Sequence, residues 1–304
     1  MKKKKKYSSM FTILLLFCSI LFYCNEDISN YVDISDSILK RTITDGISVS
    51  DKDLEIYYLD VGQADSILIR CNDKNMLIDA GNNEDGVKLV SYFKSLGINK
   101  FDYVFGTHAH EDHIGGMDDI IDNFEIDKFY MPDVITTTST FEDLLDSLEN
   151  RTVRFNTPNI GDNYYMDKIN IKVLYVGKDE NDLNNSSIVL KLNYGNNSFL
   201  FMGDATNKVE KLLLNKDIES DVIKIGHHGS QYSSSMSFLD SVNPNYAIIS
   251  VGKGNSYNHP KDIVLSRLKK IDVKVYRTDL DGSILIKSDG NKMLFDKIHT
   301  NTNG

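Results

Sequence analysis

FGTHAHEDHIGG, residues 105–116, places three of the chain's seven histidines within six positions, directly behind an apolar run. His108 and His110 are separated by one residue, so both rings project from the same face of an extended segment. Asp112 and His113 then enter a turn that the following glycines permit. Imidazoles and carboxylates in this density suit zinc, and the carboxylates also accept manganese. A His pair beside an Asp-His pair therefore predicts two divalent metal ions.

Strands and helices alternate around this stretch from residue 53 to the end of the chain. Two apolar hairpins, at 67–81 and 189–205, each end on an aspartate, Asp79 in the first and Asp204 in the second. In each half a helix and a further strand follow, and that strand delivers histidines. This faint repeat predicts an α/β fold with two sheets and helices outside them.

The chain begins with a positively charged and then apolar segment. Lys2–Lys6 precede the apolar run Met10–Tyr23, which is typical of an export signal. Cys24 stands where a lipoprotein signal would place its acylated cysteine, while residues 7–23 are near the lower limit of about 17 for a membrane-spanning helix. Either way, we expect the lysines to stay inside and the rest to face outward, anchored at the extracellular face of the cytoplasmic membrane or secreted.

Composition and this pattern divide the chain into four parts. With 41% hydrophobic residues among 304, it can fill one large core or two small ones. We expect a leader or anchor at 1–24, a polar linker at 25–52, a single domain at 53–296 and a polar tail at 297–304, in which His299 is incidental. Cys71 is the one cysteine of the body and is expected to be a buried apolar residue.

HAHEDH resembles the H-x-H-x-D-H signature of the metallo-β-lactamase superfamily. Seven motifs in order resemble the soluble hydrolase domain of the DNA-uptake channel ComEC and its free-standing relatives. They are LDVGQADSILI, MLIDAG, HAHEDHIGG, NNSSIVLKL, FLFMGDA, DVIKIGHHGSQYSS and NSYNHP. The resemblance implies an αββα sandwich of two mixed sheets over residues 53–296. The sequence shows one apolar segment in place of ComEC's multi-helix portion, so we expect the hydrolase without the channel.

The resemblance also implies ligands for the two metals. His108 and His110 would bind the first ion, Asp112 and His113 the second, and Asp204 would bridge the two. The superfamily usually supplies another histidine to the first metal, but DLNNSSIVL, residues 182–190, contains none. The first metal would then be under-coordinated, weakly held or served by a distant histidine. The Asn-Ser run there is either a hairpin entry or part of the site.

Three more histidines complete the expected site. We expect His227 to be a metal ligand and its neighbour His228 a general acid, although geometry must decide between them because adjacent residues on a strand point opposite ways. His259 is expected to be the last ligand of the second metal; the alternative is a loop histidine capping a helix that starts at Pro260.

Two carboxylates are expected behind the ligands. Asp79 would orient a ligand histidine by accepting a hydrogen bond from its other nitrogen. Asp65 would either support the metals in the same way or belong to a structural turn.

The implied reaction is hydrolysis by a metal-activated water, which Asp112 would orient. The ComEC likeness favours phosphodiesters, with single-stranded DNA as the family's substrate. Removing the five leader lysines takes the formal net charge from −10 to −15, which disfavours tight binding along DNA. A small phosphodiester, or DNA held only at the metals, would agree with both the ComEC likeness and the negative net charge. The alternatives are hydrolysis of β-lactams or other esters, or a degenerate module that only binds metal or ligand. The sequence identifies no protein partner.

Overall fold

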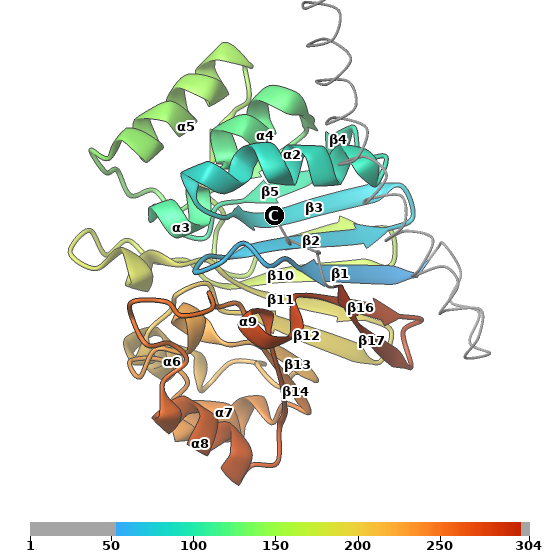
Figure 1. Cartoon of the computed structure of the whole chain (residues 1–304), viewed down its shortest axis with the longest axis vertical. Helices are drawn as coiled ribbons and strands as arrows, with labels where there is room; N and C mark the ends of the chain where they lie inside the picture. Colours follow the sequence, from blue (N-terminus) through green and yellow to red (C-terminus); the bar gives the residue numbers. More distant parts are fainter. Residues whose placement is uncertain (1–52, 299–304) are drawn as a thin grey trace, which may run out of the picture. The chain divides into compact units, whose positions relative to one another are not determined.

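The computed structural model describes residues 53–298, so the expectations for the leader, the linker and His299 lie outside the described residues. Within this range two large sheets form the centre of the molecule, with helices on both outer faces (Figure 1). The arrangement is the α/β sandwich of two mixed sheets predicted from the sequence.

The first sheet has eight strands and mixes antiparallel with parallel pairs. In spatial order they are β17 (Met293–Ile298), β16 (Ser283–Ser288), β1 (Leu54–Tyr58), β2 (Ser66–Cys71), β3 (Lys74–Ala80), β5 (Tyr103–Phe105), β7 (Phe129–Tyr130) and β8 (Phe155–Asn156). A separate pair is formed by β4 (Lys100–Phe101) and β6 (Glu125–Ile126).

The second sheet has seven strands. In spatial order they are β15 (Lys274–Arg277), β14 (Tyr246–Ile249), β13 (Val222–Lys224), β12 (Asn197–Phe201), β11 (Val189–Tyr194), β10 (Ile169–Tyr175) and β9 (Asn163–Met166). The inner faces of the two sheets share one apolar core, in which the Tyr58 and Phe201 rings stack with centroids 6.2 Å apart. Cys71 is buried in this core, as expected.

Helices cover the outer faces because each carries one apolar stripe. On the first sheet lie α2 (Gly86–Ser95), α4 (Met117–Asn123) and α5 (Ser139–Asn150), with the short α3 (Glu111–Ile114) at the strand ends (Figure 1). On the second lie α6 (Asn207–Leu213), α7 (Met236–Val242) and α8 (Asp262–Lys270), whose buried residues form a second apolar cluster with that sheet. The one-turn α9 (Thr278–Asp281) connects β15 to β16.

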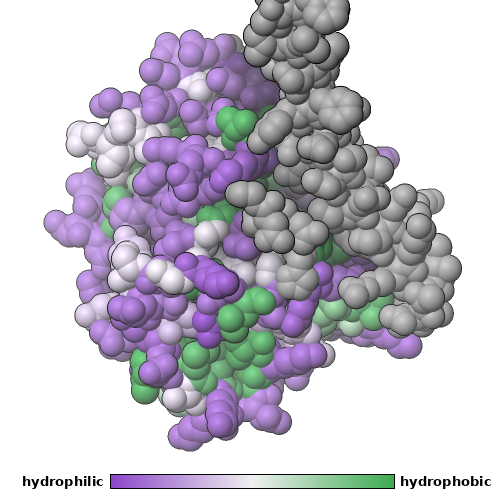
Figure 2. Space-filling model, viewed as in Figure 1, coloured by the Kyte–Doolittle hydropathy of each residue, from purple (hydrophilic) through white to green (hydrophobic). Residues whose placement is uncertain are grey.

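The surface is polar where the helices face solvent. Figure 2 shows the visible face as mostly hydrophilic, with a hydrophobic area near α8 and α9. Lys269 and Lys270 are exposed at the end of α8 while Val264 and Leu268 are buried, so the basic stretch is a solvated helix face. Within residues 53–298, no helix has the length and apolar character needed to cross a bilayer.

The faint sequence repeat corresponds to a repeated topology. In the first half the antiparallel hairpin β2–β3 is followed by α2 and then β5, which pairs parallel to β3. In the second half the antiparallel hairpin β11–β12 is followed by α6 and then β13, which pairs parallel to β12. Both β5 and β13 end at histidine-bearing segments, so the topology brings the two sets of histidines to the same edge of the sandwich.

Candidate metal centre

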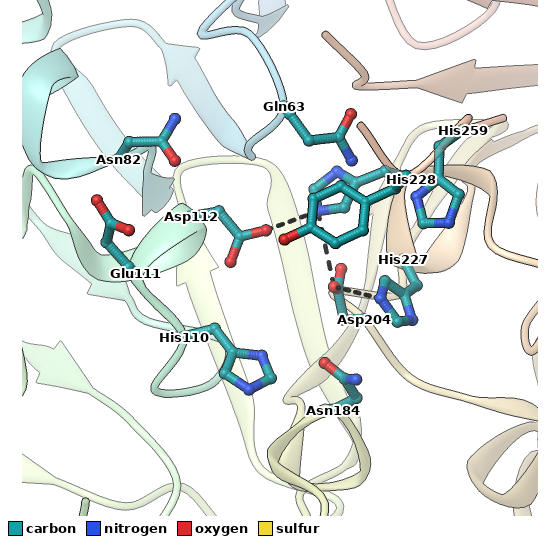
Figure 3. A pocket seen from close by; sticks show the side chains of 11 residues that line it. Gln63, Asn82, His110, Glu111, Asp112, Asn184, Asp204, His227, His228 and His259 are labelled. Atoms are coloured by element: carbon teal, nitrogen blue, oxygen red, sulfur yellow. Dashed lines mark ion pairs between the residues drawn. The ribbon is translucent and has the colours of Figure 1, made fainter. Parts of the chain in front are cut away.

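A cavity of about 470 Å³ lies where these strand ends meet (Figure 3). The wall of this cavity is mainly polar, because carboxylates, imidazoles and amides dominate it. The lining residues are Gln63, Asn82, His110, Glu111, Asp112, Asn184, Asp204, His227, His228, Tyr257 and His259.

Four side chains at the base of the cavity offer donor atoms to a common point. The donor atoms of Asp112, His113, Asp204 and His228 all lie within 4.8 Å of one another. His113 Nε2 is 3.3 Å from Asp204 Oδ1, and His228 Nε2 is 3.2 Å from Asp112 Oδ2 and 3.6 Å from Asp204 Oδ2. Although these distances are short, the buried atoms His113 Nε2, His228 Nε2 and Asp204 Oδ1 form no hydrogen bond of acceptable geometry. Unpartnered imidazole and carboxylate donors converging in this way fit a divalent metal ion.

Asp79 holds His113 from behind, as expected. Its Oδ2 lies 2.8 Å from His113 Nδ1 and accepts a hydrogen bond from Thr107 Oγ1 at 2.8 Å, while its Oδ1 accepts the Thr107 backbone N–H at 2.7 Å. The Asp79 backbone has a φ of 59°, which turns the carboxylate toward these groups. A protonated Nδ1 leaves the Nε2 lone pair of His113 available to a metal.

His228 is fixed by a different acceptor. Its Nδ1 is 3.0 Å from the carbonyl oxygen of Ser250 and 3.5 Å from Asp65 Oδ1. The hydrogen on Nδ1 therefore points away from the cavity and Nε2 points into the four-residue cluster. Asp65 thus lies behind His228, a candidate ligand, as it would if it supported the metals rather than only forming a structural turn.

His227 and His228 do not lie on a strand. They belong to the short helical turn η3 (Gly226–Gly229), where each has a φ of 52°. The turn sends His228 into the cluster, while His227 Nε2 lies 3.7 Å from Asp204 Oδ2, nearer the cavity, with the His227 side chain 24% exposed. The geometry therefore differs from our assignment of His227 as ligand and His228 as general acid, because Nε2 of His228 faces two carboxylates.

His259 stands outside the four-residue cluster. Its ring lies 5.7 Å from that of His227 and stacks on Tyr257 at 5.7 Å between centroids. His259 lines the same cavity, but His228 rather than His259 belongs to the group of donor atoms around Asp112 and His113. The physical reason is the turn η3, which no strand-based reading of GHHGS anticipates.

His108 and His110 form a second group beside the cluster. His108 Nε2 is 2.9 Å from His110 Nδ1, and the His108 and His113 ring centroids are 4.1 Å apart. His108 Nδ1 lies near two hydroxyls, Thr107 Oγ1 at 3.2 Å and Ser187 Oγ at 3.5 Å, which leaves Nε2 directed to the site. The structure thus brings His108, His110, Asp112, His113, Asp204, His227 and His228 into one region.

Positive and negative charges balance within the cluster. Burial alone would raise the pKa of Asp204, but the His113 and His228 imidazoles hold it well below its usual range. Burial alone would lower the pKa of His113, but Asp204 and Asp79 raise it well above its usual range. Protons on the imidazoles therefore compensate the carboxylates, and a metal ion would replace them.

One buried ion pair beneath the site was not anticipated. Lys224, fully buried on β13, places Nζ 2.7 Å from Asp65 Oδ2 and 3.1 Å from the carbonyl oxygen of Ile225. Its signal in the sequence is a lysine inside the apolar run DVIKI, directly before the histidines. This lysine therefore pairs with Asp65, the carboxylate that lies behind His228.

The glycines after HAHEDH serve close packing rather than a turn. Gly115 and Gly116 have φ values of −56° and −90°, which any residue adopts. A Cβ on Gly115 would lie 2.2 Å from the backbone carbon of Asn82, and one on Gly116 would lie 2.6 Å from the Cα of Gly86. Only glycines allow α3 to approach the segment after β3 this closely, and this contact sets the position of Asp112 and His113.

Comparison with known proteins defines the class. The family model described as the metallo-β-lactamase superfamily matches residues 59–253, and the chain belongs to this superfamily of metallo-hydrolases. Solved structures with TM-scores above 0.5 share the fold, and two of them serve as examples. CmlA, a diiron β-hydroxylase from Streptomyces venezuelae, has a TM-score of 0.53 at 15% identity, over 79% of this chain and 55% of that one. The metallo-β-lactamase fold protein YhfI from Bacillus subtilis has a TM-score of 0.55 at 10% identity, over 78% of this chain and all of that one.

Sequence relatives narrow the resemblance to ComEC-type competence proteins. The chain is 30% identical to ComE operon protein 3 of Bacillus subtilis over 76% of its length, and 29% identical to competence protein ComA of Neisseria gonorrhoeae over 78%. Recombination protein 2 of Haemophilus influenzae is 30% identical over 75%. These matches confirm the resemblance drawn from the seven motifs. The chain spans about a third of these relatives, with 32%, 33% and 28% of their lengths covered.

Proposed function

We propose that this chain is a phosphodiesterase that acts through a dinuclear metal centre. The observation that carries the proposal is the convergence of two groups of metal-binding side chains. Donor atoms of Asp112, His113, Asp204 and His228 lie within 4.8 Å of one another, and the His108–His110 pair lies beside them, with the His108 and His113 ring centroids 4.1 Å apart. Asp204 would bridge two ions, because a carboxylate can direct one oxygen to each and its buried Oδ1 has no hydrogen-bond partner. Similarity to ComEC-type proteins supports a phosphodiester substrate.

Bound there, two divalent ions would lower the pKa of a water molecule toward neutrality and offset negative charge on a substrate oxygen. The chain's own residues would position the reactants. Asp112, whose side chain is 31% exposed, reaches the cavity and would orient the attacking water. Burial lowers the pKa of His227, so its neutral ring would donate a hydrogen bond to a substrate oxygen rather than a proton.

The wall of the cavity favours a substrate that is held mainly at the metals. None of the described residues lining it is a lysine or arginine, and the formal net charge of the whole chain is −10. Tyr257, 63% exposed at the rim, offers an aromatic face on which a base could stack. A small phosphodiester or the end of single-stranded DNA satisfies these features better than a long duplex.

Turnover of bis-p-nitrophenyl phosphate and of a single-stranded oligonucleotide tests the proposal. Metal-loaded protein should cleave at least one of them, and an Asp112→Ala preparation made in parallel should not, which controls for contaminating nucleases. If protein carrying two metals per chain cleaves neither, the proposed reaction is wrong.

Two other functions share this site. Hydrolysis of β-lactams or other esters requires the same metal-activated water, and a chromogenic β-lactam or p-nitrophenyl ester in the same assay would detect it. A module that only binds metal is favoured by one observation, the absence of a histidine from residues 182–190. Stoichiometric metal with no turnover of any of these substrates would support that second function.

We also propose that the protein is exported and works at the outer face of the cytoplasmic membrane. The basis is the sequence pattern of Lys2–Lys6 followed by one apolar run and a polar segment. Protease added to cells stripped of their wall should digest a tagged domain, and protection of that domain would contradict the proposal.

A further inference from the structure

The first metal position has fewer evident ligands than the second. His108 and His110 supply two nitrogens and Asp204 would share one oxygen, whereas the second position has Asp112, His113 and His228 besides Asp204. An ion held by two imidazoles and half of a shared carboxylate would be bound weakly. A further donor from the chain is expected near His110.

The run Asn184–Ser187, in and just after the helical turn η2 (Leu183–Ser186), lies beside the first position: Ser187 Oγ is 3.5 Å from His108 Nδ1, and Asn184 lines the cavity with His110. Its other polar side chains are engaged. Asn185 Nδ2 donates to Asp182 Oδ2 at 2.8 Å, Ser186 Oγ donates to the Leu183 carbonyl oxygen at 2.6 Å, and Ser187 Oγ accepts the Asp204 backbone N–H at 3.1 Å. These bonds fix the turn against the site.

Asn184 is the exception in this run. Its Oδ1 is buried and has no hydrogen-bond partner, and its side chain lines the same cavity as His110 and Asp204. In the view of Figure 3 the Asn184 oxygen is turned toward the space between those two residues. A buried acceptor without a partner is costly and calls for an explanation, such as a bound ion.

We infer that Asn184 Oδ1 is a ligand of the first metal, together with His108 and His110, in place of the missing histidine. An amide oxygen is a hard, neutral donor of the kind that manganese accepts readily, while imidazole suits zinc. The two positions would therefore differ in selectivity, and the first would prefer Mn²⁺ more strongly than a site with three histidines. This inference rests on the dinuclear centre of the proposed function, although not on the reaction.

Metal binding without substrate tests the inference. The full chain is stripped with a chelator, and Mn²⁺ binding is followed by electron paramagnetic resonance of the free ion, with competition by Zn²⁺. Wild type should bind two Mn²⁺ per chain. Asn184→Ala should weaken one of them by at least about tenfold, and Asn99→Ala, which removes an exposed amide outside the cavity, should weaken neither.

Two substitutions keep the test decisive if the alanine variant misfolds, which circular dichroism would reveal. Asn184→Asp should tighten the weaker Mn²⁺ site, because it adds a charge to the donor. Asn184→His should shift that site toward Zn²⁺ by at least about tenfold relative to Mn²⁺. Unchanged Mn²⁺ and Zn²⁺ affinities in these folded variants, or a wild type that binds one ion, would overturn the inference. If metal binding changes as expected and no phosphodiester is cleaved, the inference holds and the proposed reaction fails.

Discussion

The two hairpins that lead into the site end on carboxylates with the same topological position, and these two carboxylates meet opposite sides of one imidazole ring. Asp79 belongs to β3 and Asp204 follows β12 by three residues. Asp79 Oδ2 lies 2.8 Å from Nδ1 of His113, while Asp204 Oδ1 lies 3.3 Å from Nε2 of the same ring. One imidazole is thus held between the two halves of the molecule. Topology brings both carboxylates to the site, and the local backbone decides which side of the ring each one meets.

Removing metal should have the largest effect on turnover, because it removes both ions that Asp204, unlike Asp79, would ligate directly. We expect a chelator to abolish phosphodiester turnover, and Mn²⁺ or Zn²⁺ to restore it. The metal ions activate the attacking water, and the imidazoles and carboxylates that bind them cannot replace them in this role. The measurement is turnover before and after chelation, with metal content determined alongside. Full activity in a sample with no detectable metal would contradict it.

Asp204→Ala should come next, because it would remove a ligand from both ions at once. We expect turnover to fall by at least about a thousandfold and both metals to bind more weakly. Metal stoichiometry measured on the same preparation separates lost binding from lost chemistry. A variant that keeps two metals and turnover within about tenfold of wild type would show that Asp204 does not bridge.

Asp112→Ala affects one ion and the orientation of the attacking water. We expect turnover to fall by at least about a hundredfold, as loss of a central electrostatic group commonly does. His299→Ala is the control, since the tail residue should change nothing measurable. A small effect at Asp112 combined with a large one at His227 would move the water-orienting role to the second half.

Asp79→Asn should have a smaller effect, because Asp79 acts through His113. The amide keeps the shape of the side chain but weakens the hydrogen bond that fixes the imidazole. We expect metal affinity to fall by about ten- to a hundredfold and turnover to approach that of wild type at saturating metal. If saturating metal restores nothing, Asp79 has a role in the reaction itself.

His259→Ala should have the smallest effect, because this residue lies outside the four-residue cluster. We expect a loss below the roughly hundredfold typical of a missing acid–base group, with metal content unchanged. His228→Ala, in contrast, should release a metal. The reverse ranking of these two variants would restore His259 as the last ligand.

The sequence best predicted which candidate ligands lie together where those residues are close together along the chain. His108, His110, Asp112 and His113 lie in one short segment, and a single strand end brings them to one place. Asp204 could be anticipated because its hairpin resembles the one that ends on Asp79. The sandwich itself could be predicted for a related reason, since the alternation of strands and helices is a local signal.

Prediction was less successful where one turn decides direction. Two adjacent left-handed residues in η3 direct His228 rather than His227 into the cluster, and the sequence GHHGS does not reveal that conformation. Lys224 was missed because burial of a lysine depends on its partner, Asp65, which lies 159 positions away. Contacts at that separation arise only from the packing of the two sheets.

The division of the ligands between the two sheets has a thermodynamic consequence. His113 follows β5 of the first sheet, whereas Asp204 and His228 follow β12 and β13 of the second. An ion held among them acts as a noncovalent crosslink between the layers, and the unfolded chain cannot reproduce it. By mass action, one such site at a hundred times its dissociation constant adds about 2.7 kcal/mol to the free energy of unfolding. The thermal midpoint should therefore rise with the concentration of free metal, and scarcity of metal would expose the protein to proteolysis as well as inactivate it.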